Sequence, residues 1–448
     1  MPQRILTLLT LSALLSGCSS FGVVSNSPKA PITTAPEYSI QSTMTQRPLG
    51  NVTLMLAFSG GGSRAAALAY GVLEELRDTQ IQRGEQTLRL LDEVDVISSV
   101  SGGSFTAAYY GLHGDKTFKK FEKVFLRQDI TSLLLESVFN PTQWFSDKAR
   151  TDRAIEFYEE TVFKGATFGD LQKIHGPLIV INTTDLGHGS RFSFTQEYFD
   201  LLCSDLTHFP IARAVTASSS VPVIFTPVVL ENYRHCKTKD NTLLTDPTQN
   251  LLASYELAEA KKDLQQYIRT DTQHKYIHLV DGGITDNLGL RAIYEVMELA
   301  GGAKQILTKI KQKPAGHFAV IAVNASTHSS PDIGLTNEAP DVETTINAVS
   351  DIQLHRYNAA TIELFQQGMK RWSKALSNPQ KSVTPYFIEV SFQNLKESKD
   401  LDFFNRIPTS FALTKQEADE LIKAGRTLLR QHPIYKSLIQ NLNRPAQN

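Results

Sequence analysis

Two strand-like runs, each followed at once by glycine or serine and then by a helical pattern, constrain the fold more than any other feature of this sequence. The first run, Val52–Phe58, precedes three glycines, and apolar residues then recur at helical spacing from Arg64 to Arg77. The second run, Val94–Val100, precedes a helix of small residues that begins at Gly102. Strand followed by helix, twice in succession, is typical of an α/β sheet with crossover helices.

The rest of the chain continues this pattern. Apolar runs predict strands at 178–183, 191–195, 276–280, 318–324 and 385–392, and helical spacing predicts helices at 211–218, 290–300, 344–372 and 415–430. We expect one domain over residues 51–448. A polar segment, 231–275, interrupts the strand-rich pattern, and we expect it to be an insertion with a surface helix over 251–268.

Composition excludes some classes of function. The 448 residues include 45 basic and 46 acidic side chains, for a formal charge of −1, with no long run of one sign. Nucleic-acid binding is therefore not expected. The three cysteines form no Cys-x-x-Cys or Cys/His cluster, so we expect no metal, and we expect no organic cofactor.

Ser101 is the candidate nucleophile. It follows a strand and precedes a helix, and a sharp turn there would expose its hydroxyl above the sheet edge. Because such turns are crowded, small residues are needed two positions before and after the serine. Ser99 and Gly103 meet this need, although Ser99 departs from the usual G-x-S-x-G pattern.

The glycine triplet Gly60–Gly62 lies between the first strand and its helix. Backbone N–H groups at a helix N-terminus favour an anion, so the loop could bind a phosphate or the oxyanion of an acyl-transfer reaction. A phosphate-binding P-loop ends in Gly-Lys-Ser/Thr, whereas this loop continues Ser63-Arg64-Ala65. The oxyanion interpretation is therefore the stronger one.

Asp281 ends the strand-like run 276–280 and is followed by Gly282 and Gly283. A carboxylate at a strand end can reach a nucleophile at another strand end. A normal aspartate, with a pKa of about 3.9, is a weak base, so burial would have to raise its basicity. Taken alone, the segment is also compatible with a turn aspartate before the next helix.

In this order, the GGGSRA, SVSGG and DGG segments resemble the patatin-like phospholipases, which are lipid acyl hydrolases. The stretches 183–195 and 212–228 add to the likeness, which spans most of 52–300, while Ser99 and Ala65 depart from it. The resemblance implies a three-layer α/β/α sandwich with a mainly parallel central sheet. It also implies a Ser–Asp dyad in place of a triad.

Site residues follow from the resemblance by position. Ser101 corresponds to the nucleophile and Asp281 to its base. The expected oxyanion-hole and supporting residues are Gly60, Gly61, Gly62 and Gly102, with Arg64, Gly103, Gly282 and Gly283 in support.

The N-terminus predicts export and a lipid anchor. Arg4 precedes the apolar stretch 5–15, which is too short to span a bilayer and fits a signal peptide over residues 1–17. The stretch ends in Leu15-Ser16-Gly17-Cys18, which resembles the bacterial lipoprotein processing box and implies lipidation of Cys18. Because Ser19 follows Cys18, the resemblance favours the outer membrane of a Gram-negative envelope.

Residues 18–50 are rich in Ser, Thr and Pro, and we expect a lipidated end with a flexible tether. With Cys18 used by lipid, Cys203 and Cys236 remain. In an oxidising compartment they could form a disulfide or stay as free thiols, since sequence gives no distance between them.

The sequence therefore predicts a membrane-anchored serine acyl-ester hydrolase of the phospholipase A or lysophospholipase type. The expected partners are an acyl-ester substrate and the membrane. Two alternatives stay open: a non-catalytic lipid-binding or interaction lipoprotein, and a triad hydrolase using His317 or His328. Head group, chain length, ester position and oligomeric state are not specified by the sequence.

Overall fold

The computed structural model describes residues 23–30, 37–130, 132, 150–222, 224–234, 236, 255–269, 274–328, 332–335, 337–395 and 397–444. The expected signal peptide and Cys18 lie outside these residues.

An eight-stranded, mainly parallel sheet forms the centre of the molecule, in the order β12-β11-β2-β5-β6-β10-β9, with β7 paired to β6. Strands β12, β11, β2, β5 and β6 run parallel, whereas β10 and β7 are antiparallel to β6. The sheet strands are β2 (Val52–Phe58), β5 (Val94–Val100), β6 (Leu178–Asp185), β7 (Ser190–Ser193), β9 (Val228–Glu231), β10 (Tyr276–Asp281), β11 (His317–Asn324) and β12 (Thr384–Ser391). Outside it lie β1 (Ser27–Pro28) with β8 (Ser204–Asp205), and β3 (Gln80–Arg83) with β4 (Gln86–Arg89).

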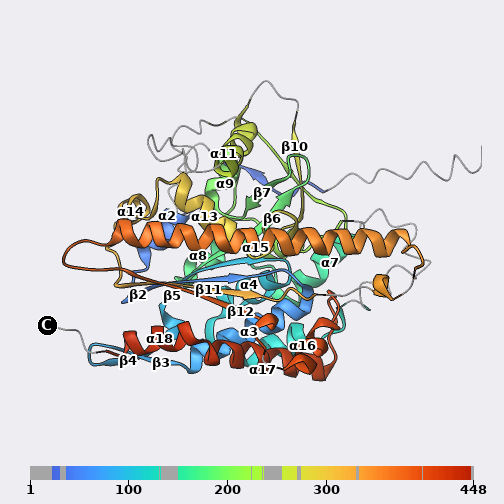
Figure 1. Cartoon of the computed structure of the whole chain (residues 1–448). Helices are drawn as coiled ribbons and strands as arrows, with labels where there is room; N and C mark the ends of the chain where they lie inside the picture. The colour runs from blue at the N-terminus through green and yellow to red at the C-terminus, as the bar shows by residue number, and fades with distance from the viewer. Residues whose placement is uncertain are drawn as a thin grey trace, which may run out of the picture.

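Helices cover both faces of this sheet. They are α2 (Ile40–Gln46), α3 (Gly62–Asp78), α4 (Gly102–His113), α5 (Thr117–Phe121), α7 (Arg150–Tyr158), α8 (Phe168–Ile174), α9 (Gln196–Leu201), α10 (Ile211–Ser218), α11 (Tyr255–Ile268), α12 (Gly283–Asp286), α13 (Leu290–Leu299), α14 (Ala303–Lys309), α15 (Val342–Leu376), α16 (Ser398–Asn405), α17 (Lys415–Gln431) and α18 (Pro433–Leu442). Figure 1 shows the sheet between α15 on one side and α3, α17 and α18 on the other.

The alternation of side chains along the strands builds two hydrophobic layers. On β11, Phe318, Val320 and Ala322 pack with α13 and α15, whereas Ala319, Ile321 and Val323 belong to the larger core on the other face. A strand that is buried on both faces reads as a continuous apolar run, as this one does. The predicted three-layer fold with a mainly parallel sheet is confirmed.

The N-terminal segment corrects one expectation. We expected residues 18–50 to be a flexible tether, but the described parts are docked on the domain. Ser27 pairs with Asp205 and Lys29 N–H donates to the Cys203 carbonyl at 2.8 Å. Tyr38 and Met44 are buried in the main core. The two apolar side chains attach this otherwise polar segment to a core that is built by later parts of the chain.

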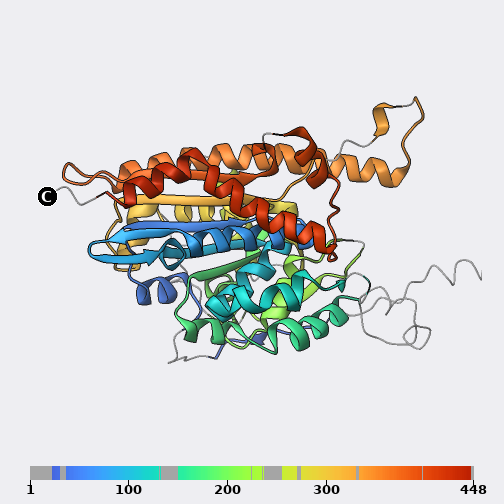
Figure 2. The same cartoon turned by 90° about the horizontal axis from the view of Figure 1, so that it is seen from below.

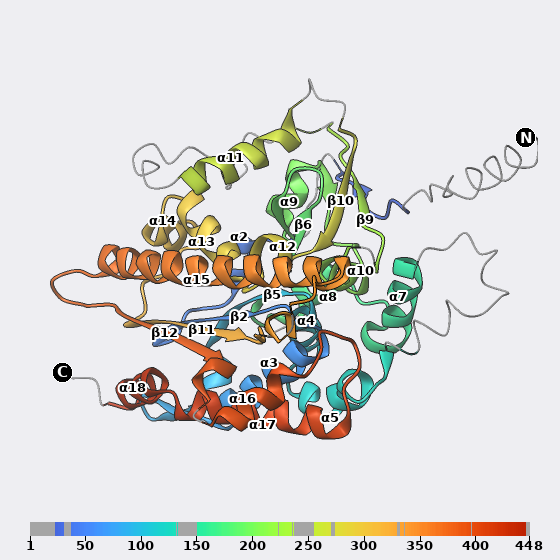
Figure 3. The same ribbon diagram turned by 45° about the vertical axis from the view of Figure 1, so that its right-hand side comes forward.

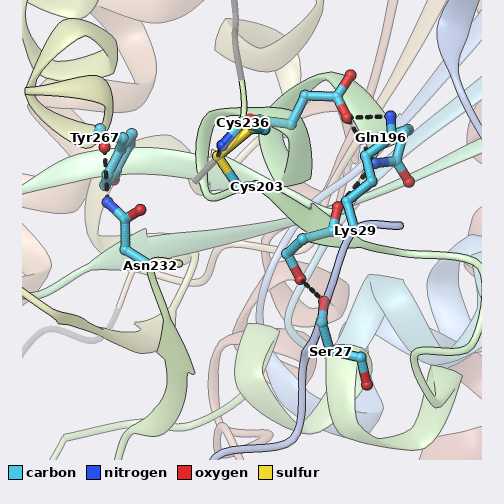
Figure 4. Close-up of a disulfide and its surroundings, with 9 residues drawn as sticks. Ser27, Lys29, Gln196, Cys203, Asn232, Cys236 and Tyr267 are labelled. Atoms are coloured by element: carbon cyan, nitrogen blue, oxygen red, sulfur yellow. Dashed lines mark hydrogen bonds and ion pairs between the residues drawn. A yellow bond between two sulfur atoms is a disulfide. The ribbon is translucent and has the colours of Figure 1, made fainter. Parts of the chain in front are cut away.

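The expected insertion joins the paired strands β9 and β10. Its described helix, α11, packs on the body through Leu264 and Tyr267, and the Tyr267 hydroxyl donates to Asp185 Oδ2 at 3.0 Å. Near its start, Cys236 forms a disulfide with Cys203, with the two Cα atoms 5.4 Å apart. Figure 4 shows this bond beside Ser27 and Lys29 of the N-terminal segment.

In the part of the chain that the structure describes, no helix has the length and apolar character needed to cross a bilayer.

Candidate active site

Ser101 occupies a strained turn between β5 and α4. Its φ of 50° lies in the left-handed region, where a residue other than glycine is uncommon. This turn directs the serine away from the path of the strand and puts it at the N-terminus of α4. Ser99, which departs from the usual pattern, is buried and donates to the Val180 carbonyl at 3.1 Å, so the sheet accommodates its hydroxyl.

Ser101 and Asp281 meet across strand β6. Val100 is paired with Asn182 of β6, and Asp281 is paired from the other side with the next residue, Thr183. The turn at Ser101 closes the remaining gap, and Ser101 Oγ donates to Asp281 Oδ2 at 2.8 Å. Two residues 180 positions apart in the chain therefore form one hydrogen-bonded pair.

The Asp281 carboxylate has the environment of a base. Burial raises its pKa to about 6, and the hydrogen bonds from the Gly283 N–H and from Ser101 offset part of that rise. The Gly283 N–H donates to Oδ1 at 2.7 Å, which leaves Oδ2 for Ser101. A carboxylate with a pKa near 6 is ionised at neutral pH and is a stronger base than a normal aspartate.

Helix α10 and the turn after it support both members of the pair. Ser218 Oγ accepts the N–H of Ser101 at 2.8 Å and donates to the Asn182 carbonyl at 2.6 Å. The Ser218 carbonyl accepts the N–H of Gly282, and the Ser220 carbonyl accepts the N–H of Asp281 at 2.9 Å. Gly282 is needed here, because a Cβ would lie 2.4 Å from the Asn182 carbonyl oxygen.

The glycine loop lies beside Ser101 because β2 and β5 are paired, with Phe58 opposite Ser99. The Gly60 N–H donates to the Asn287 carbonyl at 2.9 Å. We expected this N–H to bind an oxyanion, but it already has an acceptor in the folded chain. Within the described residues, the N–H groups of Gly61 and Gly62 have no acceptor. They lie at the N-terminus of α3, where the first N–H groups lack intrahelical partners and carry partial positive charge.

The glycine loop and the serine turn approach too closely to leave room for side chains on the glycines. A Cβ at Gly102 would lie 1.9 Å from the Gly62 carbonyl oxygen, and one at Gly103 would lie 2.7 Å from the Ser59 carbonyl oxygen. Gly62 has a φ of 60°, and a Cβ there would lie 2.3 Å from the Ser410 carbonyl oxygen. These glycines bring the two helix N-termini together.

Arg64 fastens this loop to the C-terminal third of the chain. The side chain is buried and donates to the carbonyls of Ala325 and Ile407 and to the Thr409 hydroxyl. Burial lowers its pKa to about 10. The guanidinium is therefore ionised at neutral pH. Because its described hydrogen bonds all go to protein groups, Arg64 positions the loop.

The histidines of the triad alternative lie elsewhere. His317 begins β11 and pairs with Val52, at the amino end of the parallel strands, whereas Ser101 follows their carboxyl end. Seven residues of strand, at about 3.3 Å each, separate the two ends. His328 stacks on His355 with ring centroids 3.9 Å apart and contacts Gln393. The described structure gives neither a contact with Asp281 or Ser101.

Sequence reasoning did not single out Ser218 or Asn182, which hold the serine turn, and it noted Asn287 only as a residue close behind the Asp281-Gly282-Gly283 segment of the family likeness, without its contact to the glycine loop. Ser218 lies in a stretch of three serines, and none of the three residues has a signature of its own. Among the described residues, no group of three or more His, Cys, Asp or Glu side chains could hold a metal ion.

A buried serine on a strained strand-to-helix turn, hydrogen-bonded to a carboxylate beside free backbone N–H groups, has the parts that acyl transfer requires. The sequence matches the family model described as patatin-like phospholipase over residues 56–294, more than half of the chain. The chain belongs to this family, and this membership supports lipid acyl hydrolase activity.

The solved structures to which this chain is similar include human GIVD cytosolic phospholipase A2, with a TM-score of 0.44 and 14% sequence identity over 95% of this chain and 68% of that chain. The structure of the same human enzyme in complex with methyl gamma-linolenyl fluorophosphonate has a TM-score of 0.39 and 11% sequence identity, over 91% of this chain and 62% of that chain. Among curated proteins, no relative is found.

Proposed function

We propose that this chain is a membrane-anchored serine acyl-ester hydrolase of the phospholipase A or lysophospholipase type, which uses Ser101 and Asp281 as a dyad. The observation that carries the proposal is the 2.8 Å hydrogen bond from Ser101 Oγ to Asp281 Oδ2. Family membership supports a lipid ester as substrate.

In the proposed reaction, Asp281 Oδ2 takes the proton of Ser101 while Oγ attacks the ester carbonyl carbon. The tetrahedral intermediate then breaks its bond to the alcohol, which leaves with the proton from Asp281. Asp281 next takes a proton from water, the hydroxide attacks the acyl-serine, and the proton returns to Ser101 as the fatty acid leaves. The raised pKa of Asp281, about 6, suits a group that must accept and return a proton.

The oxyanion in this scheme is held by the N–H groups of Gly61 and Gly62, with the Gly102 N–H at the start of α4. Support comes from their lack of other acceptors in the described structure and from the close approach of the two helix N-termini. One such donor is typically worth about 2.7–4 kcal/mol in the transition state.

Replacement of the nucleophile tests the proposal. Ser101→Ala should abolish hydrolysis of a soluble short-chain ester and covalent labelling by a fluorophosphonate. Ser398→Ala, a change at an exposed serine of α16, is the matched control and should keep both. Undiminished hydrolysis by a folded Ser101→Ala protein would contradict the mechanism. A folded parent protein that takes no label would favour the alternative, a lipid-binding module without catalysis.

The membrane anchor and the envelope location belong to the same proposal and are supported by the N-terminal sequence alone. Growth with an alkyne fatty acid should label the chain, and Cys18→Ala should remove the label. A Cys18→Ala chain that keeps the label would end this part of the proposal while leaving the dyad untouched.

A further inference from the structure

Helix α15 passes over the candidate site. Asn358 of this helix donates to Ser326 Oγ at 3.1 Å, and the same hydroxyl accepts from Asn287, whose carbonyl holds Gly60. About two turns nearer the helix N-terminus, the charge of Asp351 acts on Arg64 of the glycine loop. From Asn358 toward its N-terminus, helix α15 therefore extends from the candidate site past Arg64 of the glycine loop.

The N-terminal half of α15 carries exposed aliphatic side chains where it leaves the body. Val349 and Ile352 are each 53% exposed and, three positions apart on a helix, are neighbours on one surface. Leu335, shortly before the helix, is 77% exposed. Figure 2 shows this end of α15 and the segment before it projecting beyond the carboxyl end of the sheet, the end that carries Ser101.

The start of the described chain emerges at the same end of the molecule. In Figures 1 and 3 the blue N-terminal segment leaves toward the side that the strand arrows point to, and the C-terminus lies on the opposite side. Five residue steps separate Cys18 from Val23, and even fully extended they span at most about 18 Å. A lipid on Cys18 would therefore hold this end close to a bilayer.

The charge of the same region restricts the kind of bilayer. Between residues 332 and 356 there are five acidic side chains and one arginine, so the stretch of chain that carries Leu335, Val349 and Ile352 has a net negative charge. Anionic lipids repel such a surface within a Debye length, whereas zwitterionic lipids do not.

We propose that Leu335, Val349 and Ile352 form an interfacial surface that contacts a bilayer of zwitterionic phospholipids and brings the end of the sheet that carries Ser101 toward it. This inference rests on the proposed function and deepens it. The substrate is a phospholipid taken directly from the membrane, in the same membrane that holds the anchor, and not a dissolved lipid.

Vesicle flotation tests this surface without relying on catalysis. The full chain carries Cys18→Ser, so that no lipid is attached, and Ser101→Ala, so that the vesicles stay intact. We expect Val349→Asp/Ile352→Asp to lower the fraction bound to phosphatidylcholine vesicles at least ten-fold. The matched control is Ile174→Asp/Ile434→Asp, which adds the same charge at exposed isoleucines of α8 and α18. Ile174 precedes the start of β6, at the amino end of the sheet.

The same variants with Ser101 retained are then assayed on vesicles and on a soluble short-chain ester. We expect the ratio of the two rates to fall at least ten-fold for the α15 variant and to stay constant for the control. Equal losses in both variants, or no loss in either, would overturn the inference. A parent protein that binds vesicles but cleaves neither substrate would refute the proposed function and leave the surface standing.

Two further outcomes are informative. Addition of anionic phosphatidylglycerol should weaken binding, and tighter binding to the anionic vesicles would overturn the choice of a zwitterionic surface. If the α15 variant converts a dimer to a monomer and vesicle binding is unchanged, the surface joins two copies of the chain and the inference is wrong.

Discussion

At the scale of single residues, the burial of Asp281 determines how the site responds to pH. Its pKa of about 6 means that the ionised, base-competent form predominates above that value. We expect kcat/KM for a soluble ester to be constant from about pH 7 upward and to fall roughly ten-fold per pH unit below 6. A pH profile of kcat/KM checks this, and a profile that stays flat down to pH 4.5 would contradict the assignment of Asp281 as base.

The same burial lowers the stability of the folded protein at neutral pH. The folded-state pKa lies above the usual 3.8, so the ionised carboxylate destabilises the folded protein, fully above pH 6 and not at all below about 3.8. Asp281→Asn should therefore be inactive yet more stable at pH 7, by up to about 3 kcal/mol. Denaturant unfolding at pH 7 and pH 4 measures the gain, which should shrink toward zero at the lower pH. A gain of equal size at both values would mean that the charge is not its cause.

The candidate nucleophile and base could be predicted from the sequence, whereas the residues that hold them in position could not. Ser101 and Asp281 are candidates from the sequence because each stands at the end of an apolar run and each is followed by glycine, and the structure brings the two side chains within hydrogen-bond distance. Ser218 looks like any serine of a small-residue helix, and only the folded chain puts its hydroxyl between Ser101 and Asn182. Likewise, the carbonyl of Asn287, which takes the Gly60 N–H, is a backbone group with no mark in the sequence.

At the scale of elements, helix α3 depends on a segment more than 340 residues away. The Ser63 N–H donates to the Ser410 carbonyl at 2.8 Å, and Arg64 binds Ile407 and Thr409. Helix α17 packs along α3, and its Arg430 pairs with the buried Glu75. The last third of the chain, where the family likeness is weaker, thus holds the glycine loop in place.

Gly62 provides the test of this dependence. Alanine there must adopt a φ of 60° and would put its Cβ 2.3 Å from the Ser410 carbonyl oxygen. We expect Gly62→Ala to lower kcat by about 100-fold or more, because the displaced loop loses its oxyanion donors. Gly84→Ala is the matched control, since Gly84 has a φ of 63° with nothing within 4 Å of its added Cβ. A Gly62→Ala variant that keeps the kcat of the Gly84→Ala control would contradict the dependence of the loop on the contact with Ser410.

Element boundaries followed the apolar pattern closely where strands are buried on both faces. The run expected at 318–324 is β11, His317–Asn324, and the helix expected at 211–218 is α10 with the same bounds. The direction of β10 was not predictable, because an apolar run ending in Asp281 reads the same in a parallel or an antiparallel strand.

At the scale of the whole molecule, the region before residue 50 shows where composition misleads. Ser, Thr and Pro favour an extended chain, yet the Asn26 side chain bonds to Ser204 and to Glu231, and Tyr38 is buried against the sheet. The hydrogen-bond partners of the Asn26 and Tyr38 side chains lie between 141 and 205 positions later in the chain, and no local pattern can reveal such contacts. The docked segment also brings the expected anchor close to the end of the sheet that carries Ser101, which a long tether would not do.

The disulfide between Cys203 and Cys236 belongs to this docking region and should stabilise it without serving catalysis. It closes a loop over a sequence separation of 33, for which the chain-entropy model gives about 4 kcal/mol. In the Cys18→Ser background, the Cys203→Ser/Cys236→Ser variant should unfold at a lower denaturant concentration while kcat on a soluble ester changes less than about two-fold. The backbone carbonyl of residue 203 is unchanged in this variant, so the N-terminal segment keeps its hydrogen bond from the Lys29 N–H. Titration of the unreduced, denatured parent should find no free thiol, whereas two free thiols per chain would show that the bond does not form.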